Sequence, residues 1–334
     1  MKNFWFIFLF LFILIAQSLF AENENLLNIK GLIEIDYYLA KVNDGTTNKK
    51  ESDFLLSTAQ LSLEKEFNKK INSSLVFLYE QGEDNDQIKV DEAKLDIVVN
   101  EKTNFIVGKR VLPFGVFETF LISDPLTLNI GETKKVSAGL SYKIAEGIIG
   151  EIALFKGPKE MAEENNVAKD LVLSLNYEAE YLKINLGYIT NMLAIDNLPD
   201  EIGIDVNNDT IDKRGNGLAT SLNLTIDKLI LIGEGITNKG EIKVNNTDYN
   251  IKAYNVEAGY QVNEKLTAGI RYEFLKYETN NNITRKVKNY GIGLNRNIYE
   301  NTNLLFEYLK SRDNTSGANE LKNDIFTVEI SYQF

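Results

Sequence analysis

The chain has 334 residues, of which 44% are hydrophobic and 25% are charged, so its composition is that of a folded protein rather than a disordered one. It contains no cysteine and no histidine, which excludes disulfides, thiolate and imidazole metal sites, and hydrolases of the Ser-His-Asp class. The formal net charge of −12 argues against an electrostatic nucleic-acid binder, because a phosphate backbone requires a basic surface.

Residues 1–21 are predicted to form a secretory signal peptide. Lys2 precedes the uninterrupted apolar stretch Phe4–Ile15, and the small residue Ala21 ends the segment. A basic start, an apolar stretch of about 12 residues and a small final residue are typical of a cleaved leader. A retained membrane helix is the alternative, but the stretch is shorter than the ~20 residues that cross a bilayer. The predicted mature chain is 22–334.

From residue 28 onward the sequence alternates apolar and polar residues in short segments. The pattern is clearest in segments 170–178, 181–188, 265–274 and 323–334. Strict alternation over such lengths predicts strands with one apolar and one polar face. Sixteen such segments begin near residues 28, 54, 71, 89, 103, 135, 147, 169, 181, 216, 229, 250, 265, 286, 302 and 323.

The connections between these segments fall into two classes that alternate along the chain. The short, polar ones are Asn68–Lys70, Asn100–Lys102, Ala145–Glu146, Ala179–Glu180, Asp227–Lys228, Asn263–Glu264 and Tyr299–Asn301. The long ones, rich in Asn, Asp, Gly and Lys, include Val42–Ser52, Lys156–Val167, Asn191–Arg214 and Asn238–Asp248.

Short turns at one end, long loops at the other and an even strand number predict an all-β fold, an antiparallel transmembrane β-barrel of the bacterial outer membrane. An open sheet edge in lipid would leave backbone groups unpaired, so the sheet must close. The apolar faces then contact outer-membrane lipid and the polar faces line the lumen. A soluble β-sandwich is the alternative, since alternation is also expected there.

The segment 111–134 does not alternate. It is long, carries two of the four prolines and is much more apolar than the other long loops. Long loops in compact domains are usually functional. We expect this one to fold into the barrel and narrow the pore. Covering the barrel rim or forming a subunit contact are the alternatives.

This part of the chain resembles a known family. The run 108–119, followed by 122–128 and 131–133, resembles the LbtU-type siderophore porins, with the matching residues lying within 105–140. The Gly-Lys-Arg and Pro-Phe-Gly arrangement is more loosely similar to the phosphate-selective porin O and P family. The resemblance implies a sixteen-stranded outer-membrane barrel without a plug domain, associated with uptake of iron–siderophore complexes.

The polar residues of this motif are the candidates for the pore constriction. With the resemblance, Glu118, Asp124 and Glu132 are carried over as pore-loop residues. Basic residues bracket the apolar loop on both sides, and they create a transverse field across the constriction if they face these carboxylates. Ordinary ion pairs at the loop ends are the alternative. The bracketing residues are Lys109, Arg110, Lys134 and Lys135.

Placing the apolar faces outward also fixes which charges face the lumen. Acidic candidates outnumber basic ones, which favours a modest preference for cations over anions. The alternative is a solvated wall with little selectivity, because salt screens charges beyond about 8 Å. The acidic candidates are Glu34, Asp36, Glu64, Glu80, Glu92, Asp96, Glu151, Asp170, Glu257, Glu273, Glu307 and Glu329, and the basic ones are Lys30, Lys94, Arg110, Lys183 and Arg271.

The final residue, Phe334, ends an alternating apolar segment. An aromatic last residue resembles the signal that the barrel-assembly machinery recognises in outer-membrane proteins. A lipid-facing end of the last strand is the simpler explanation, and both place Phe334 on the outer face.

Together these features predict a porin, a passive aqueous channel for ions and small solutes, with ferric siderophore uptake as its more specific form. A structural or adhesive barrel whose long loops bind a surface partner is the alternative. An outer-membrane enzyme is disfavoured because histidine is missing. No catalytic residue, cofactor or metal site is predicted, and a homo-oligomer is left open.

Overall fold

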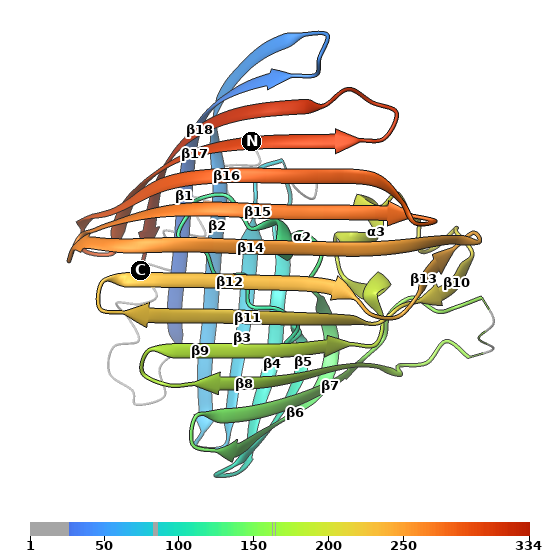
Figure 1. Ribbon diagram of the computed structural model, residues 1–334. Helices are drawn as coiled ribbons and strands as arrows, with labels where there is room; N and C mark the ends of the chain where they lie inside the picture. Colours follow the sequence, from blue (N-terminus) through green and yellow to red (C-terminus); the bar gives the residue numbers. More distant parts are fainter. Residues whose placement is uncertain (1–26, 83–85, 162, 164) are drawn as a thin grey trace.

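The structure is a computed structural model that describes residues 27–82, 86–161, 163 and 165–334. The predicted signal peptide, residues 1–21, lies outside the described residues. Within them, sixteen long antiparallel strands form a closed barrel (Figure 1). The first and last strands pair over twelve residues, including Ile35 with Ile330, and this pairing closes the ring. Because every strand then has two neighbours, no backbone edge faces lipid.

The sixteen barrel strands follow one another around the ring in chain order. Their bounds are β1 (Asn28–Asn43), β2 (Asn48–Asn68), β3 (Ile71–Tyr79), β4 (Lys89–Asn100), β5 (Thr103–Val111), β6 (Lys134–Ala145), β7 (Ile148–Phe155), β8 (Asp170–Glu178), β9 (Leu182–Ile189), β11 (Gly217–Ile226), β12 (Leu229–Asn238), β14 (Thr247–Asn263), β15 (Leu266–Thr279), β16 (Asn282–Tyr299), β17 (Thr302–Thr315) and β18 (Leu321–Gln333).

The remaining elements in the described part of the chain are short. Strands β10 (Ile211–Arg214) and β13 (Ile242–Val244) pair with each other in the loops beyond β9 and β12. Helix α2 (Leu126–Asn129) lies between β5 and β6, and η1 (Met192–Ala194) and α3 (Leu198–Glu201) lie between β9 and β11. None of the helices in the described residues is long and apolar enough to cross a bilayer.

The predicted strand alternation is confirmed by the burial of side chains. Outward residues such as Leu140, Leu173, Val256 and Ile292 are exposed although they are apolar, which fits contact with lipid rather than water. Their neighbours on the same strands turn inward and are buried. Tyrosines near strand ends, among them Tyr260 and Tyr332, are also exposed on the outer surface, as expected at a membrane interface.

The short turns predicted from the sequence are present, but two of the long loops differ from expectation. In place of a long loop at 42–52, β1 and β2 continue to a tight turn between Asn43 and Asn48. Within that turn, the Thr46 hydroxyl and the N–H groups of Thr46 and Thr47 donate to the Asp44 carboxylate, which holds its pKa below the ordinary value.

The second difference concerns segment 191–214, which its sequence groups with the long polar loops. Its residues Met192, Leu193, Ile195 and Leu198 are almost fully buried. They belong to an apolar core that fills part of the barrel at its loop end, together with inward residues of the wall. The expectation of a polar inner face is therefore wrong in this region, because a loop packed inside the barrel needs an apolar surface to pack against. The wall residues of this core include Val172, Ile189, Ala219, Ile236, Ile251, Ala253, Leu275 and Val287.

Candidate functional site

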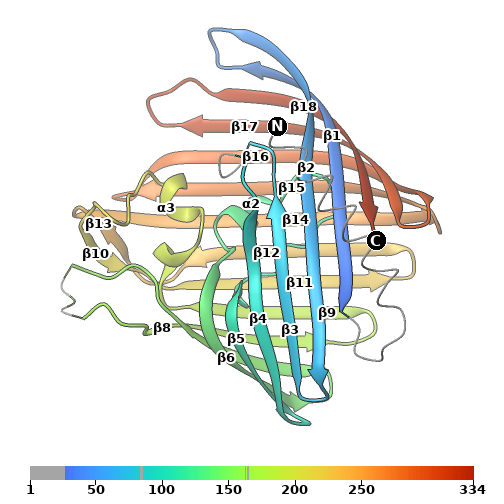
Figure 2. The same ribbon diagram turned by 180° about the vertical axis from the view of Figure 1, so that it is seen from behind.

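The segment between β5 and β6 lies inside the barrel, as the position of α2 between the two walls shows in both views (Figures 1 and 2). We call residues 112–133 the inner loop. The N–H of Leu112 donates to the carbonyl of Thr133 at 2.8 Å, so the loop leaves and rejoins the wall at one point. From there it crosses to the opposite side of the ring, where its contacts with β12, β14, β15 and β17 lie.

Four glutamates on that wall accept hydrogen bonds from backbone N–H groups of the inner loop. These bonds satisfy backbone donors that have no water to bind. They are strong hydrogen bonds because the acceptor is a charged carboxylate. We call these four residues the anchoring glutamates. The bonds are Val116 N to Glu234 at 2.7 Å, Phe120 N to Glu257 at 2.8 Å, Ser123 N to Glu307 at 2.7 Å and Leu126 N to Glu273 at 2.6 Å.

Side-chain hydroxyls of the loop add to this set. Thr127 Oγ1 donates to Glu234 at 2.6 Å, and Ser123 Oγ donates to Glu307 at 2.5 Å. The four anchoring glutamates have at most 6% of their surface exposed. Strand register places two of them, Glu234 and Glu273, in one row with Asn255 and Asn289 across adjacent strands.

Arg271 supplies the positive charge that this buried acidic group requires. Its side chain is completely buried, and it forms ion pairs with Glu257 at 3.0 Å and Glu273 at 3.5 Å. The same guanidinium donates to the inner loop, to Thr119 Oγ1 and the Ser123 carbonyl, each at 2.6 Å. A planar group with five donors suits this task, because it bonds wall and loop at once.

A row of glycines gives the loop room to approach the wall. Gly259, Gly269 and Gly293 pair across β14, β15 and β16 and face inward. A Cβ at Gly259 would lie 2.9 Å from the Phe120 ring, and one at Gly293 would lie 3.3 Å from Leu121 Cγ. Larger residues in this row would push the loop towards the centre of the lumen, so the glycines set its depth.

The basic residues predicted around the loop divide between the two faces of the wall. Arg110 is buried and pairs with Glu151 at 2.6 Å, while Lys135 pairs with Asp196 at 2.5 Å. Lys134 Nζ lies 2.8 Å from Asp91 and 3.6 Å from Glu132. These charges therefore form ion pairs at the ends of the loop, which was the simpler of the two interpretations.

Lys109 does not join this group, contrary to the sequence-based prediction. It precedes Arg110 in the same strand, and consecutive residues of a strand point to opposite faces. In register it pairs with Val136, which is 72% exposed on the outer surface. Its Nζ donates to the carbonyl of Val90 at 2.6 Å.

The acidic residues carried by the loop itself have different surroundings. Glu118 accepts a hydrogen bond from Asn223 Nδ2 on β11. Asp124 is exposed, and its carboxylate interacts electrostatically with Glu80 and Glu34 as well as with Arg271. Glu132 is partly buried beside Lys134.

The predicted wall residues line the inner face as the alternation requires. Asp36 pairs in register with Glu329 across the closing strands, and Ser331 Oγ donates to Glu34 at 3.2 Å. On β4, Lys94 forms an ion pair with Glu92 at 3.2 Å. Asp96 is on the same face two residues further along, while Arg271 and Glu273 belong to the anchoring group on the other side of the ring.

Sequence reasoning missed the central part of this site. Glu234 was not recognised as an inward residue, because it shares its face of the strand with the apolar Ile232 and Ile236. Nor did the sequence show that Glu257, Glu273 and Glu307 would bind the loop rather than the pore solution. The row of inward glycines was the available signal, since glycine at consecutive cross-strand positions indicates close approach of another segment.

The fold is shared with solved outer-membrane proteins. The outer-membrane channel DcaP of Acinetobacter baumannii aligns with a TM-score of 0.69 and 13% identity, over 92% of this chain and 97% of that one. An anion-selective porin from Comamonas acidovorans aligns with a TM-score of 0.67 and 10% identity, over 93% and 100%. OmpT of Vibrio cholerae, solved in a trimer form, aligns with a TM-score of 0.64 and 14% identity, over 93% and 100%.

These identities establish a common fold and no more. No protein-family model matches the sequence, and the comparison with curated proteins gives no match. The closed barrel with an apolar outer band lies in the bacterial outer membrane, where lipid contacts that band.

Proposed function

We propose that this chain is a porin that forms a passive aqueous channel across the outer membrane, with the inner loop as its constriction. The observation that carries the proposal is the attachment of the loop to one wall. The anchoring glutamates and Arg271 hold it against β12–β17, so the path for solutes runs between the loop and the opposite wall of β1–β4. An adhesive barrel gains nothing from a loop fixed on its inner face.

We propose further that this channel prefers cations. The anchoring glutamates are buried under the loop and do not contribute charge to the solution path. The lysines on the opposite wall are paired, Lys94 with Glu92 and Lys89 with Glu80. What remains towards the path is acidic, because Glu34 and Asp36 on β1 are partly exposed and Asp124 is exposed on the loop. Acidic rings favour cations over anions.

The test is the reversal potential of single channels in a planar bilayer with a KCl gradient. The wild-type channel is expected to select K⁺ over Cl⁻, and Asp124→Lys is expected to move the reversal potential towards zero or reverse its sign. Lys109→Glu provides the control, because that residue faces outward. An unchanged reversal potential in the Asp124 variant would show that the loop does not line the solution path. A protein that does not conduct would contradict the proposal of a channel.

Ferric siderophore uptake is the more specific form of this proposal. Its support is the resemblance of residues 108–133 to the LbtU-type siderophore porins, carried by the Pro-Phe-Gly run and the acidic residues after it. Growth of iron-starved cells that carry or lack the chain, with a ferric siderophore as the iron source, tests it. Equal growth of both strains contradicts siderophore uptake and leaves the proposal of a general porin in place.

Assembly into a homo-oligomer is a separate proposal. The OmpT of Vibrio cholerae that shares this fold was solved in a trimer form. Chemical cross-linking of the purified protein in detergent at several concentrations tests it, and a ladder limited to the monomer contradicts it.

A further inference from the structure

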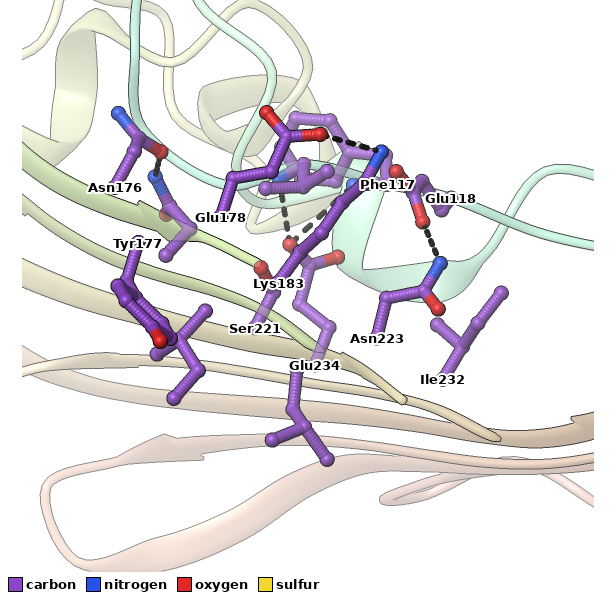
Figure 3. A pocket seen from close by; sticks show the side chains of 14 residues that line it. Phe117, Glu118, Asn176, Tyr177, Glu178, Lys183, Ser221, Asn223, Ile232 and Glu234 are labelled. Carbon is purple, nitrogen blue, oxygen red and sulfur yellow. Dashed lines mark hydrogen bonds and ion pairs between the residues drawn. The ribbon is translucent and has the colours of Figure 1, made fainter. Parts of the chain in front are cut away.

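A small pocket lies beneath the inner loop, away from the acidic wall of β1–β4. Its volume is ≈ 120 Å³, and it is bounded by loop residues 116–118 above and by the inner faces of β8, β9, β11 and β12 below (Figure 3). Eight of its fourteen lining residues are polar or charged, and the others supply apolar surface. The polar residues used below are Glu118, Glu178, Lys183, Asn185 and Asn223.

The roof of the pocket is held in an unusual backbone conformation. Phe117 has a φ of 58°, in the left-handed region that residues with a side chain rarely adopt. Glu234 Oε1 stabilises it by accepting the N–H of Val116 at 2.7 Å and the N–H of Phe117 at 3.3 Å. Strain of this kind persists where the surroundings fix it, and it is concentrated at functional sites. Here it precedes Glu118, whose carboxylate lines the pocket.

The wall of the pocket contains an unused hydrogen-bond acceptor. Asn185 is only 5% exposed, and its Nδ2 donates to Asn176 Oδ1 at 2.6 Å. Its Oδ1 has no hydrogen-bond partner among the described residues. A buried acceptor without a partner costs about 1–3 kcal/mol, so a donor from a bound solute would remove a real penalty.

The charges around the pocket favour a positive group. Glu118 and Glu178 each contribute a carboxylate, while Lys183, at 3.4 Å from Glu178, is the ammonium in the lining. Beneath the roof, Glu234 adds a further carboxylate. The lining thus has more acceptors than donors and an excess of negative charge. Phe117 and Ile232 supply apolar surface beside these groups.

We propose that this pocket is a binding subsite for a compact primary ammonium ion with a short alkyl chain. The ammonium would donate to Glu118 and to Asn185 Oδ1, and the alkyl chain would lie against Phe117 and Ile232. The proposal deepens the cation-preferring channel and rests on it for its role, since a solute would reach this pocket from the lumen, beside the path along β1–β4. Its chemistry is independent of conduction and is tested separately.

The experiment measures binding of n-propylammonium to the detergent-solubilised barrel by saturation-transfer NMR. Saturable binding is expected, and Glu118→Gln is expected to weaken it at least tenfold. Glu178→Gln, which changes a side chain that is 69% exposed and so leaves the fold intact, is expected to weaken it in the same direction. Glu146→Gln is the matched control, because Glu146 lies in a short turn with 94% exposure and outside the pocket.

Two further probes identify the chemistry that is recognised. Tetramethylammonium has the same charge without N–H donors, and 1-propanol has the alkyl chain without charge; each is expected to bind at least tenfold more weakly than n-propylammonium. Equal binding of either probe, no saturable signal, or unchanged affinity in both glutamate variants overturns the proposal. Conductance in a bilayer separates the two proposals. A protein that conducts but does not bind n-propylammonium contradicts only the subsite. A protein that binds n-propylammonium but does not conduct contradicts only the proposed function.

Discussion

Inward-facing carboxylates in this barrel have two different roles, and the role of each depends on whether the inner loop binds it. Glu257 and Glu273 share the completely buried guanidinium of Arg271 and accept loop N–H groups, so their charge is compensated within the protein. Glu34 and Asp36 on β1 are partly exposed and are not among the carboxylates that accept these loop N–H groups. In the proposed channel, the electrostatic field along the solution path therefore depends on the second group rather than on the total number of inward acids.

The contribution of one anchoring glutamate is measurable with Glu234→Ala. Three donors lose their acceptor, and each buried donor left unpaired costs about 1–3 kcal/mol. The inner loop is then expected to detach between Val116 and Thr127, giving noisier open channels of higher conductance in planar bilayers. Glu264→Ala, in the exposed β14–β15 turn, is the control. Identical conductance and noise in the two variants contradict the anchoring role.

Arg271→Met removes the positive charge from the same site. Removing one partner of a buried ion pair costs about 3–5 kcal/mol, because the other charge stays buried without compensation. We expect the folded barrel to convert to the unfolded form at a lower temperature, as read from its mobility in SDS gels after stepwise heating. The double variant Arg271→Met/Glu257→Gln is expected to regain part of the loss. A double variant less stable than Arg271→Met argues against charge compensation.

Among the elements, the strands were predictable and the loops were not. A strand that separates lipid from lumen must alternate apolar and polar side chains. Segments such as 170–178 and 265–274 can therefore be predicted as strands from their own residues. Segment 191–214 contains many polar residues, yet Leu193 and Ile195 are buried against the wall. Its packing partners come from distant strands, and no local pattern specifies them. The short strands β10 and β13 were missed for the same reason, since β10 forms by pairing with β13, a distant segment that also pairs with β14.

The candidate site shows the same division. The inward position of Arg110, Arg271 and Glu273 follows from alternation, and the structure places them there. Lys109 was misplaced because the bracketing basic residues were grouped by their nearness in sequence rather than by face. The bonds between loop backbone and wall glutamates could not be predicted, because they join residues more than 100 positions apart.

The closing pair of strands provides a test at this scale. The last residue, Phe334, exchanges backbone hydrogen bonds with Gly31, and a Cβ at Gly31 would lie 2.2 Å from the Phe334 ring. Gly31→Val is expected to displace that ring and to lower the yield of folded barrel on refolding into detergent. Gly233→Val is the matched control, because nothing lies within 4 Å of a Cβ there. Equal yields show that the ring position is irrelevant to closure.

For the whole molecule, the proposed selectivity has a definite dependence on salt. The Debye length is about 10 Å at 0.1 M ionic strength and about 3 Å at 1 M, so exposed carboxylates act over a shorter range in concentrated salt. We expect the preference for K⁺ over Cl⁻ to be clear when reversal potentials are measured near 0.1 M and to be largely lost near 1 M. A preference that is equal at both concentrations indicates selection by direct contact or by size.

The attachment of the inner loop also has a consequence for biogenesis. Ser123 and its acceptor Glu307 are 184 residues apart, so the loop is synthesised long before the wall that receives it. Until β12–β17 are in place, its apolar side chains have no wall to pack against and its N–H groups lack their acceptors. Once β18 joins β1, the ring has no opening in its side. The loop therefore reaches its bonded position only after β12–β17 have formed, which makes its docking a late step of barrel assembly.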